Sequence, residues 1–190
     1  MKLYERLPDS VTVDGKKYRV DLDFRNVLRM LDIMDDETLT PEARDWVALS
    51  CVMKKPKLEA FPAIKKLLFG DKKESGEERK RVTSFEQDAD MIRAAFRQVY
   101  GINLYKDHLH WFEFTELLNA LPEGNRYMET IGIRTRPMPP ATKYNREERE
   151  WLAMAKQRVA LKESDEQIER NYNRDVKNVF KAMLGMAQKG

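Results

Sequence analysis

The sequence has little cysteine and histidine, with one cysteine, Cys51, and two histidines among 190 residues. A single cysteine cannot form an internal disulfide, whereas small secreted domains usually contain several. The opening residues contain no apolar run of signal-peptide length, and no stretch of about 18 apolar residues is free of charge. We therefore expect a protein of a reducing compartment that has no membrane-spanning segment.

Metal-binding residues are too sparse for a conventional site. His108 and His110 stand two residues apart, so on a helix their side chains would point about 200° away from each other. His110 and Glu113 are suitably spaced but supply only two ligands, whereas protein zinc sites use three or four. The sequence thus predicts no metal site at these residues.

Glycine is equally sparse, and the eight glycines form neither of the common phosphate-binding loops, G-x-G-x-x-G and G-x-x-x-x-G-K. Nucleophilic catalysis would need a serine or cysteine beside a positioned base. Cys51 falls on an expected core face, and no serine has diagnostic neighbours. The sequence thus predicts a protein without cofactor or enzymatic activity.

The charge of the chain is nearly balanced, with 35 Lys and Arg against 32 Asp and Glu and a net charge of +3. The two signs alternate along the whole chain. Nucleic-acid binding would need basic residues gathered on one face with little acid among them. Hydrophobic residues make up 42% of the chain, which is enough to form a core. We therefore expect a folded, strongly solvated protein that does not bind nucleic acid.

The N-terminal stretch from Ser10 to Leu22 alternates apolar and polar residues on either side of Asp14 and Gly15. Asp-Gly is a preferred pair for the tight turn of a β-hairpin, because both of its residues tolerate positive φ. The pattern predicts a hairpin that packs on helices, since a lone hairpin is only marginally stable.

From Phe24 onward apolar residues recur every three or four positions, which indicates helices. The first is expected at 24–34, and the second starts with Thr40 as N-cap and Pro41 at its first position. The core face of this second helix is predicted to hold Trp46, Val47, Leu49 and Cys51. A third helix is expected at 58–69, stopped by Gly70, followed by an entirely polar loop at 71–81.

Three further helices are expected in the middle of the chain. One lies between Ser84 and Gly101, with acids at its start as the helix dipole favours. The others begin near His108 or His110 and at Tyr127. The predicted structural core of this region consists of Phe96, Tyr100, Trp111 and Phe114.

Three prolines between residues 134 and 144 predict an extended linker, because proline lacks the helical N–H donor and restricts the residue before it. The predicted organisation is a compact helical domain at 1–133, the linker at 134–144, and a C-terminal helical extension at 145–190. Capping-box patterns at Asn145 and Ser164 favour two helices, about 146–162 and 165–184, although one long helix would also fit. The fold class is therefore mainly α, a helical bundle with a small N-terminal hairpin and a C-terminal extension.

The last predicted helix carries an apolar stripe that needs a covering partner. This stripe could fold back on the body, pair with another copy, or hold a partner protein. We expect self-association or protein binding there, with packing inside the molecule as an equally weighted alternative. The candidate protein-binding residues are Tyr172, Val176, Val179, Phe180 and Met183.

Two stretches together resemble a known family: FEQDADMIRAAFRQVYGINL at 85–104, and LHWFEFTELLNAL at 109–121 followed by IGIRTR at 131–136. The opening, with Leu7-Pro8, the hairpin and Asp23-Phe24-Arg25, is also similar. The chain from about residue 1 to 161 resembles the tail-assembly chaperones of long-tailed, siphovirus-type bacteriophages of Gram-positive hosts.

The resemblance implies a protein that binds the tape-measure protein, keeps it soluble and guides tail-tube assembly. Such a protein would act in the host cell cytoplasm, would be absent from the mature virion, and would carry no catalytic residue. It could also contact other tail proteins or form a homo-oligomer. The alternatives are a structural component of the tail or head-tail junction, and a helical nucleic-acid-binding regulator.

Overall fold

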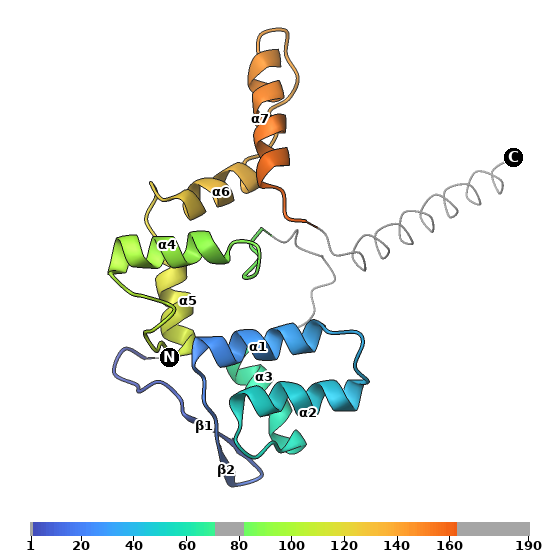
Figure 1. Cartoon of the computed structure of the whole chain (residues 1–190), viewed down its shortest axis with the longest axis vertical. Coiled ribbons are helices and arrows are strands. Elements are labelled where there is room, and N and C mark those ends of the chain that lie inside the picture. The colour runs from blue at the N-terminus through green and yellow to red at the C-terminus, as the bar shows by residue number, and fades with distance from the viewer. Residues whose placement is uncertain (1, 71–81, 163–190) are drawn as a thin grey trace, which may run out of the picture. The chain divides into compact units, whose positions relative to one another are not determined.

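The structure is a computed structural model that describes residues 2–70 and 82–162. Figure 1 shows a mainly helical chain with one small hairpin, which confirms the predicted fold class. The chain divides into two compact units, residues 1–131 and 132–190, and the division falls within helix α6, Arg126–Thr135. The two units are described separately below.

The hairpin consists of β1, Ser10–Val13, and β2, Lys16–Arg19, paired antiparallel with Val11 opposite Tyr18. Its turn residues Asp14 and Gly15 have φ of 48° and 76°, as the Asp-Gly pair predicted. Val11 is buried against α3 and the short 3-10 turn before it, and the Tyr18 hydroxyl donates a hydrogen bond to Glu59. The hairpin therefore packs on helices, as expected.

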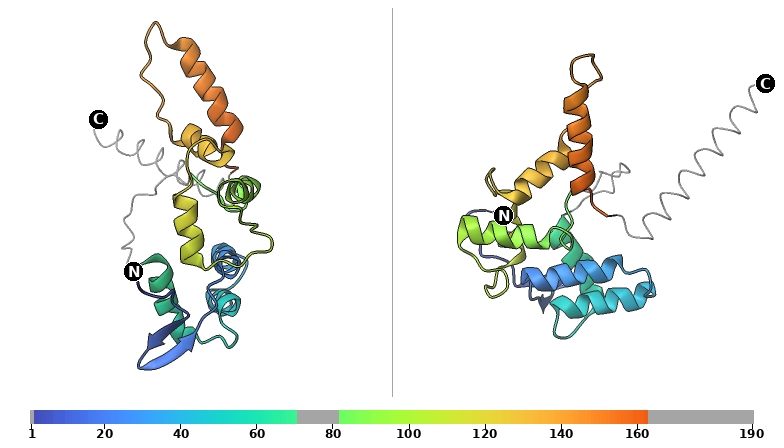
Figure 2. Two further views of the ribbon diagram at one scale, coloured as in Figure 1. Left: turned by 90° about the vertical axis from the view of Figure 1, so that its left-hand side faces the viewer. Right: turned by 45° about the horizontal axis from the view of Figure 1, so that its top comes forward.

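Helices α1, Phe24–Asp35, and α2, Pro41–Val52, lie side by side in both Figure 1 and Figure 2. Each start is capped as its sequence requires. The Asp23 carboxylate accepts the Arg25 N–H at 2.9 Å, and the Thr40 hydroxyl accepts the Ala43 N–H at 3.4 Å. Both predicted helix starts are confirmed.

The predicted core face of α2 is wrong in part. Trp46 is 52% exposed, and the buried residues are Ala48, Leu49 and Val52. The sequence interpretation favoured the largest apolar side chain, whereas the fully buried Ala48 is a small residue that allows neighbouring elements to come close. The face that packs is therefore rotated away from Trp46.

The third predicted helix is present as a 3-10 turn, η1 at Leu58–Ala60, followed by α3 at Phe61–Phe69. It ends at Gly70, which has φ of 72°. The predicted loop at 71–81 lies outside the described residues.

Helix α4, Ala89–Tyr100, ends at Gly101 in the left-handed conformation, and α5 spans Trp111–Asn119. Before α4, the buried Asp88 carboxylate accepts the Ser84 N–H at 2.9 Å. Helix α6 continues to Thr135, one turn of residues further than the short helix expected from Tyr127. The predicted order of helices is thus confirmed.

An aromatic cluster forms the centre of the first unit. Phe114 is 1% exposed, and its ring lies 4.7 Å from that of Phe24, 5.3 Å from Phe96 and 5.9 Å from Trp111, measured between centroids. Phe96 and Trp111 are also buried. Tyr100 is half-buried and its hydroxyl donates to the Leu117 carbonyl at 2.9 Å.

The second unit contains the end of α6, a non-helical stretch at 136–145, and α7, Arg146–Val159. The predicted capping box at Asn145 is wrong, because its side chain makes no hydrogen bond to α7. Its amide instead accepts the Thr142 N–H and donates to the Pro140 carbonyl, each at 2.9 Å. The helix start is correct, but Asn145 closes the turn before it. The further predicted helix at 165–184 lies outside the described residues.

Candidate binding surface

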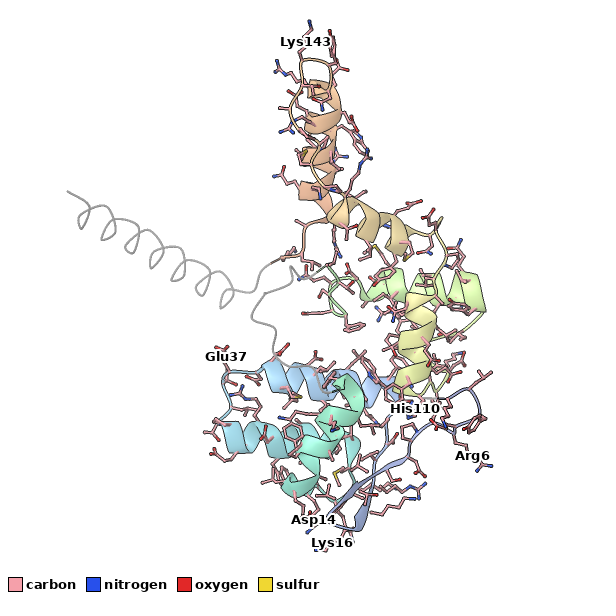
Figure 3. The ribbon with its side chains drawn as sticks, turned by 180° about the vertical axis from the view of Figure 1, so that it is seen from behind. Arg6, Asp14, Lys16, Glu37, His110 and Lys143 are labelled. Atoms are coloured by element: carbon pink, nitrogen blue, oxygen red, sulfur yellow. The ribbon has the colours of Figure 1, made fainter. Side chains whose placement is uncertain are left out.

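The two histidines of the sequence hold loops together. His110 is the N-cap of α5, where its Nδ1 accepts the Phe112 N–H at 3.2 Å and its Nε2 lies 3.0 Å from the Pro8 carbonyl oxygen. A neutral ring protonated on Nε2 satisfies both contacts. Figure 3 labels His110 at the start of α5. This histidine therefore ties the N-terminal arm to the aromatic cluster.

His108 belongs to a second polar junction, at the start of α1. Its Nδ1 lies 2.9 Å from the Asp23 carboxylate, which also pairs with Arg25 at 3.1 Å. The Arg25 guanidinium donates to the carbonyl oxygens of Leu104 and Asp107 at 3.0 and 2.7 Å. The sequence did not predict this junction, because its members are about 80 residues apart along the chain.

The groups that could carry chemistry have structural contacts. Among residues 2–70 and 82–162, no cluster of three or more His, Cys, Asp or Glu side chains is placed to hold a metal ion. Burial raises the pKa of the half-buried Cys51, and its sulfur lies 3.6 Å from the Val47 carbonyl oxygen. Cys51 is therefore held as the protonated thiol, the less nucleophilic form. In the part of the chain described, no helix is both long and apolar enough to cross a membrane.

The second unit is held by one face of α7. Leu152 is fully buried on this face, and Lys156 donates to the Arg134 carbonyl at 2.8 Å. The Arg134 guanidinium in turn donates to the Val159 carbonyl at 2.6 Å, and Arg149 donates to the Pro139 carbonyl. Figure 2 shows the stretch before α7 running alongside this helix, and Figure 3 labels Lys143 at the turn between them. These contacts fix which face of α7 points outward.

The outward face of α7 forms a shallow apolar groove, which we call the α7 groove. Trp151 and Met154 are 54% and 53% exposed, although both are large apolar side chains. They stand three residues apart and therefore share one side of the helix. The residues that line the α7 groove are Ile133, Trp151, Met154, Ala155, Arg158 and Val159.

A second hollow lies in the first unit, beside α4 and the loop after it. Its two arginines are Arg93 and Arg97. The Arg93 guanidinium pairs with Asp90 and lies over the Tyr105 ring at 4.8 Å. Because Arg93 already has these contacts, this hollow is a weaker binding candidate than the α7 groove.

The candidate residues from the sequence and those of the structure are different. The predicted protein-binding residues Tyr172, Val176, Val179, Phe180 and Met183 lie outside the described residues. The sequence analysis did not single out Trp151. A usable signal was present, because Trp151, Met154, Ala155 and Arg158 recur at the three- and four-residue spacing of one helix face.

These features define a mainly helical protein with an apolar helix face open to solvent. A family model described as Bacteriophage Gp15 protein matches residues 3–161, most of the 190-residue chain. The chain therefore belongs to this family of bacteriophage proteins. The match includes both the aromatic cluster and the α7 groove. No curated protein and no solved structure matches the chain.

Proposed function

We propose that this phage protein is a non-catalytic tail-assembly chaperone that binds the tape-measure protein and keeps it soluble during tail-tube assembly. The observation that carries the proposal is the α7 groove, with its exposed Trp151 and Met154. The family match supports a phage role, and the sequence resemblance supports tail assembly.

The groove has the chemistry needed to cover an apolar helix seam. A tape-measure protein is a long helical chain, and its seam must stay covered until the tube encloses it. Helices commonly bind by laying an apolar face into a groove, and methionine adapts to varied partner surfaces. Tryptophan and arginine, here Trp151 and Arg158, are enriched among residues that dominate binding energy.

The size of the exposed area sets the expected affinity change. Full burial of a large apolar side chain contributes about 1.5–3 kcal/mol, so covering the exposed half of Trp151 and Met154 would contribute roughly 2 kcal/mol in total. Losing that contribution would weaken binding by about tenfold or more, because about 1.4 kcal/mol corresponds to one factor of ten. The expected client chemistry is an apolar helix face with acidic residues beside it to meet Arg158.

The test is co-expression with the tape-measure protein encoded by the same phage. The full chain is expected to move the client into the soluble fraction, and the Trp151→Ser variant is expected to lose most of this effect. Trp46→Ser is the matched control, because Trp46 is 52% exposed and lies on α2 in the other unit. Equal loss in both variants, or no loss in either, would contradict the assignment of the α7 groove.

Purified phage particles separate the chaperone from the alternative of a tail or head-tail structural protein. A chaperone acting in the host cytoplasm should be absent from virions, whereas a structural protein should be present at a fixed copy number. Nucleic-acid binding is the remaining alternative, and it would show an affinity that falls steeply with salt.

A further inference from the structure

We propose that residues 163–190 of this chain cover the α7 groove within the same molecule, as the second arm of an antiparallel helix pair. The covering contact rests on the structure of α7 and on the sequence that follows it. Its role as a cover that the client displaces rests on the proposed function.

The geometry at the end of α7 suits a reversal of the chain. The helix ends at Val159, and Ala160 has φ of −57° and ψ of 138°, which is an extended conformation. Ser164 and Gln167 match the pattern of a helix start. The connection at 160–164 therefore has a length typical of two antiparallel helices, whose loops span about two to eight residues.

The apolar stripe of the segment would then lie along α7. If one arm ends at residue 159 and the other begins at 165, residues equally far from the turn are level, because both arms rise by about 1.5 Å per residue. Ile168 comes level with Lys156, beside Ala155, and Tyr172 comes level with Leu152, beside Trp151. The stripe thus begins over the groove.

The charges of the two arms are complementary in this arrangement. Along α7, acidic residues such as Glu147 come first and Arg158 comes near the end. The segment begins with acids, Glu163, Asp165, Glu166 and Glu169, and continues with bases, Arg170, Arg174, Lys177 and Lys181. Antiparallel pairing brings Glu166 level with Arg158 and Lys177 level with Glu147. Parallel pairing would place like charges together.

The short connection favours the segment of the same molecule over that of a second copy. A covalently linked partner separated by a few residues has an effective concentration of about millimolar or above, far higher than that of a free copy in dilute solution. The occupant of the groove is therefore the chain's own segment when no client is present.

The test uses the fluorescence of Trp151 in the full chain. The chain has three tryptophans, and Trp111 is buried, so a Trp46→Phe background leaves Trp151 as the accessible one. In that background, replacing Tyr172 and Val176 by serine is expected to shift the Trp151 emission to the red and increase its quenching by acrylamide. Asn173→Ser with Asn178→Ser is the matched control in the same segment and should leave both signals unchanged.

A charge exchange provides a second variant that does not depend on the stripe. Glu166→Lys and Arg158→Glu are each expected to increase quenching of Trp151, and the double exchange is expected to restore the protection. Equal quenching in the parent and every variant would overturn the proposal. Protection that is lost on dilution, together with a change from dimer to monomer in sedimentation, would also overturn it, because the occupant would then be a second copy.

The outcome can be separated from that of the proposed function, because the fluorescence is measured without client. Protection of Trp151 with no effect of Trp151→Ser on tape-measure solubility would support the cover and contradict the client site. Loss of client solubility with an unprotected Trp151 in the parent would contradict the cover and support the client site.

Discussion

Phe114 lies at the centre of the aromatic cluster, and its replacement tests the packing of the first unit. Its side chain is 1% exposed and has four aromatic neighbours at 4.7–6.1 Å, including Phe24 and Trp111. Phe114→Ala removes the ring from water-excluded surroundings and leaves a cavity. Such changes cost about 3–5 kcal/mol, and natural domains have a free energy of unfolding of about 5–15 kcal/mol.

Urea unfolding followed by tryptophan fluorescence measures this cost, because the Trp111 ring lies 5.9 Å from Phe114 and reports on the same cluster. The expected change is a fall in the unfolding free energy of about 3–5 kcal/mol with an unchanged slope. The control is Phe112→Ala on the same helix, where the ring is only half-buried and the expected cost is about 1 kcal/mol. Equal costs for the two variants would refute the position assigned to Phe114.

The remaining predictions concern the same unit and its titratable groups. Phe96→Ala and Trp111→Ala should each lower the unfolding free energy by about 3–5 kcal/mol, and a wild-type melt for either would place that ring outside the core. Asp88→Ala should cost about 1–3 kcal/mol, because it removes the buried acceptor of the Ser84 N–H, while the exposed Asp90→Ala should change little; melting temperatures compare them. The raised pKa of Cys51 stabilises the folded protein fully below the ordinary cysteine pKa, and this contribution is lost as the pH rises through the raised value. Alkylation of Cys51 should therefore accelerate at a higher pH in the folded protein than in the unfolded one, and identical profiles would contradict this. A chelator should leave the melting temperature unchanged, and a drop of several degrees would point to a metal site.

The sequence predicted the local elements well where one residue type controls the backbone. Asp14-Gly15 at the hairpin turn, Thr40-Pro41 at the start of α2 and Gly101 at the end of α4 each have the expected conformation. These signals act within a few residues, so they do not depend on the rest of the fold.

The errors arose where contacts between distant residues decide the outcome. Trp46 was assigned to the core of α2, but the packed face is centred on Ala48 and Leu49. Asn145 was expected to cap α7, but its amide closes the preceding turn. The junction of Arg25 with the Leu104 carbonyl joins segments whose proximity no local pattern indicates.

The candidate surface shows the same division. Its residues have a helical spacing that the sequence displays, yet spacing alone cannot tell an inward face from an outward one. The contacts of Leu152 and Lys156 settle this by fixing the inner face of α7, which leaves Trp151 and Met154 outside. Exposure was therefore the property that the sequence lacked.

Site-specific photocrosslinking tests the central claim most directly, namely that the α7 groove is the surface that binds the tape-measure protein. A photoreactive phenylalanine analogue is placed at position 151, or at position 46 as the control, in the full chain expressed with the client. The account predicts crosslinks from position 151 to the tape-measure protein when the client is present, and to residues 163–190 of the same chain when it is absent. Crosslinks to the client from position 46 but not from position 151 would contradict it.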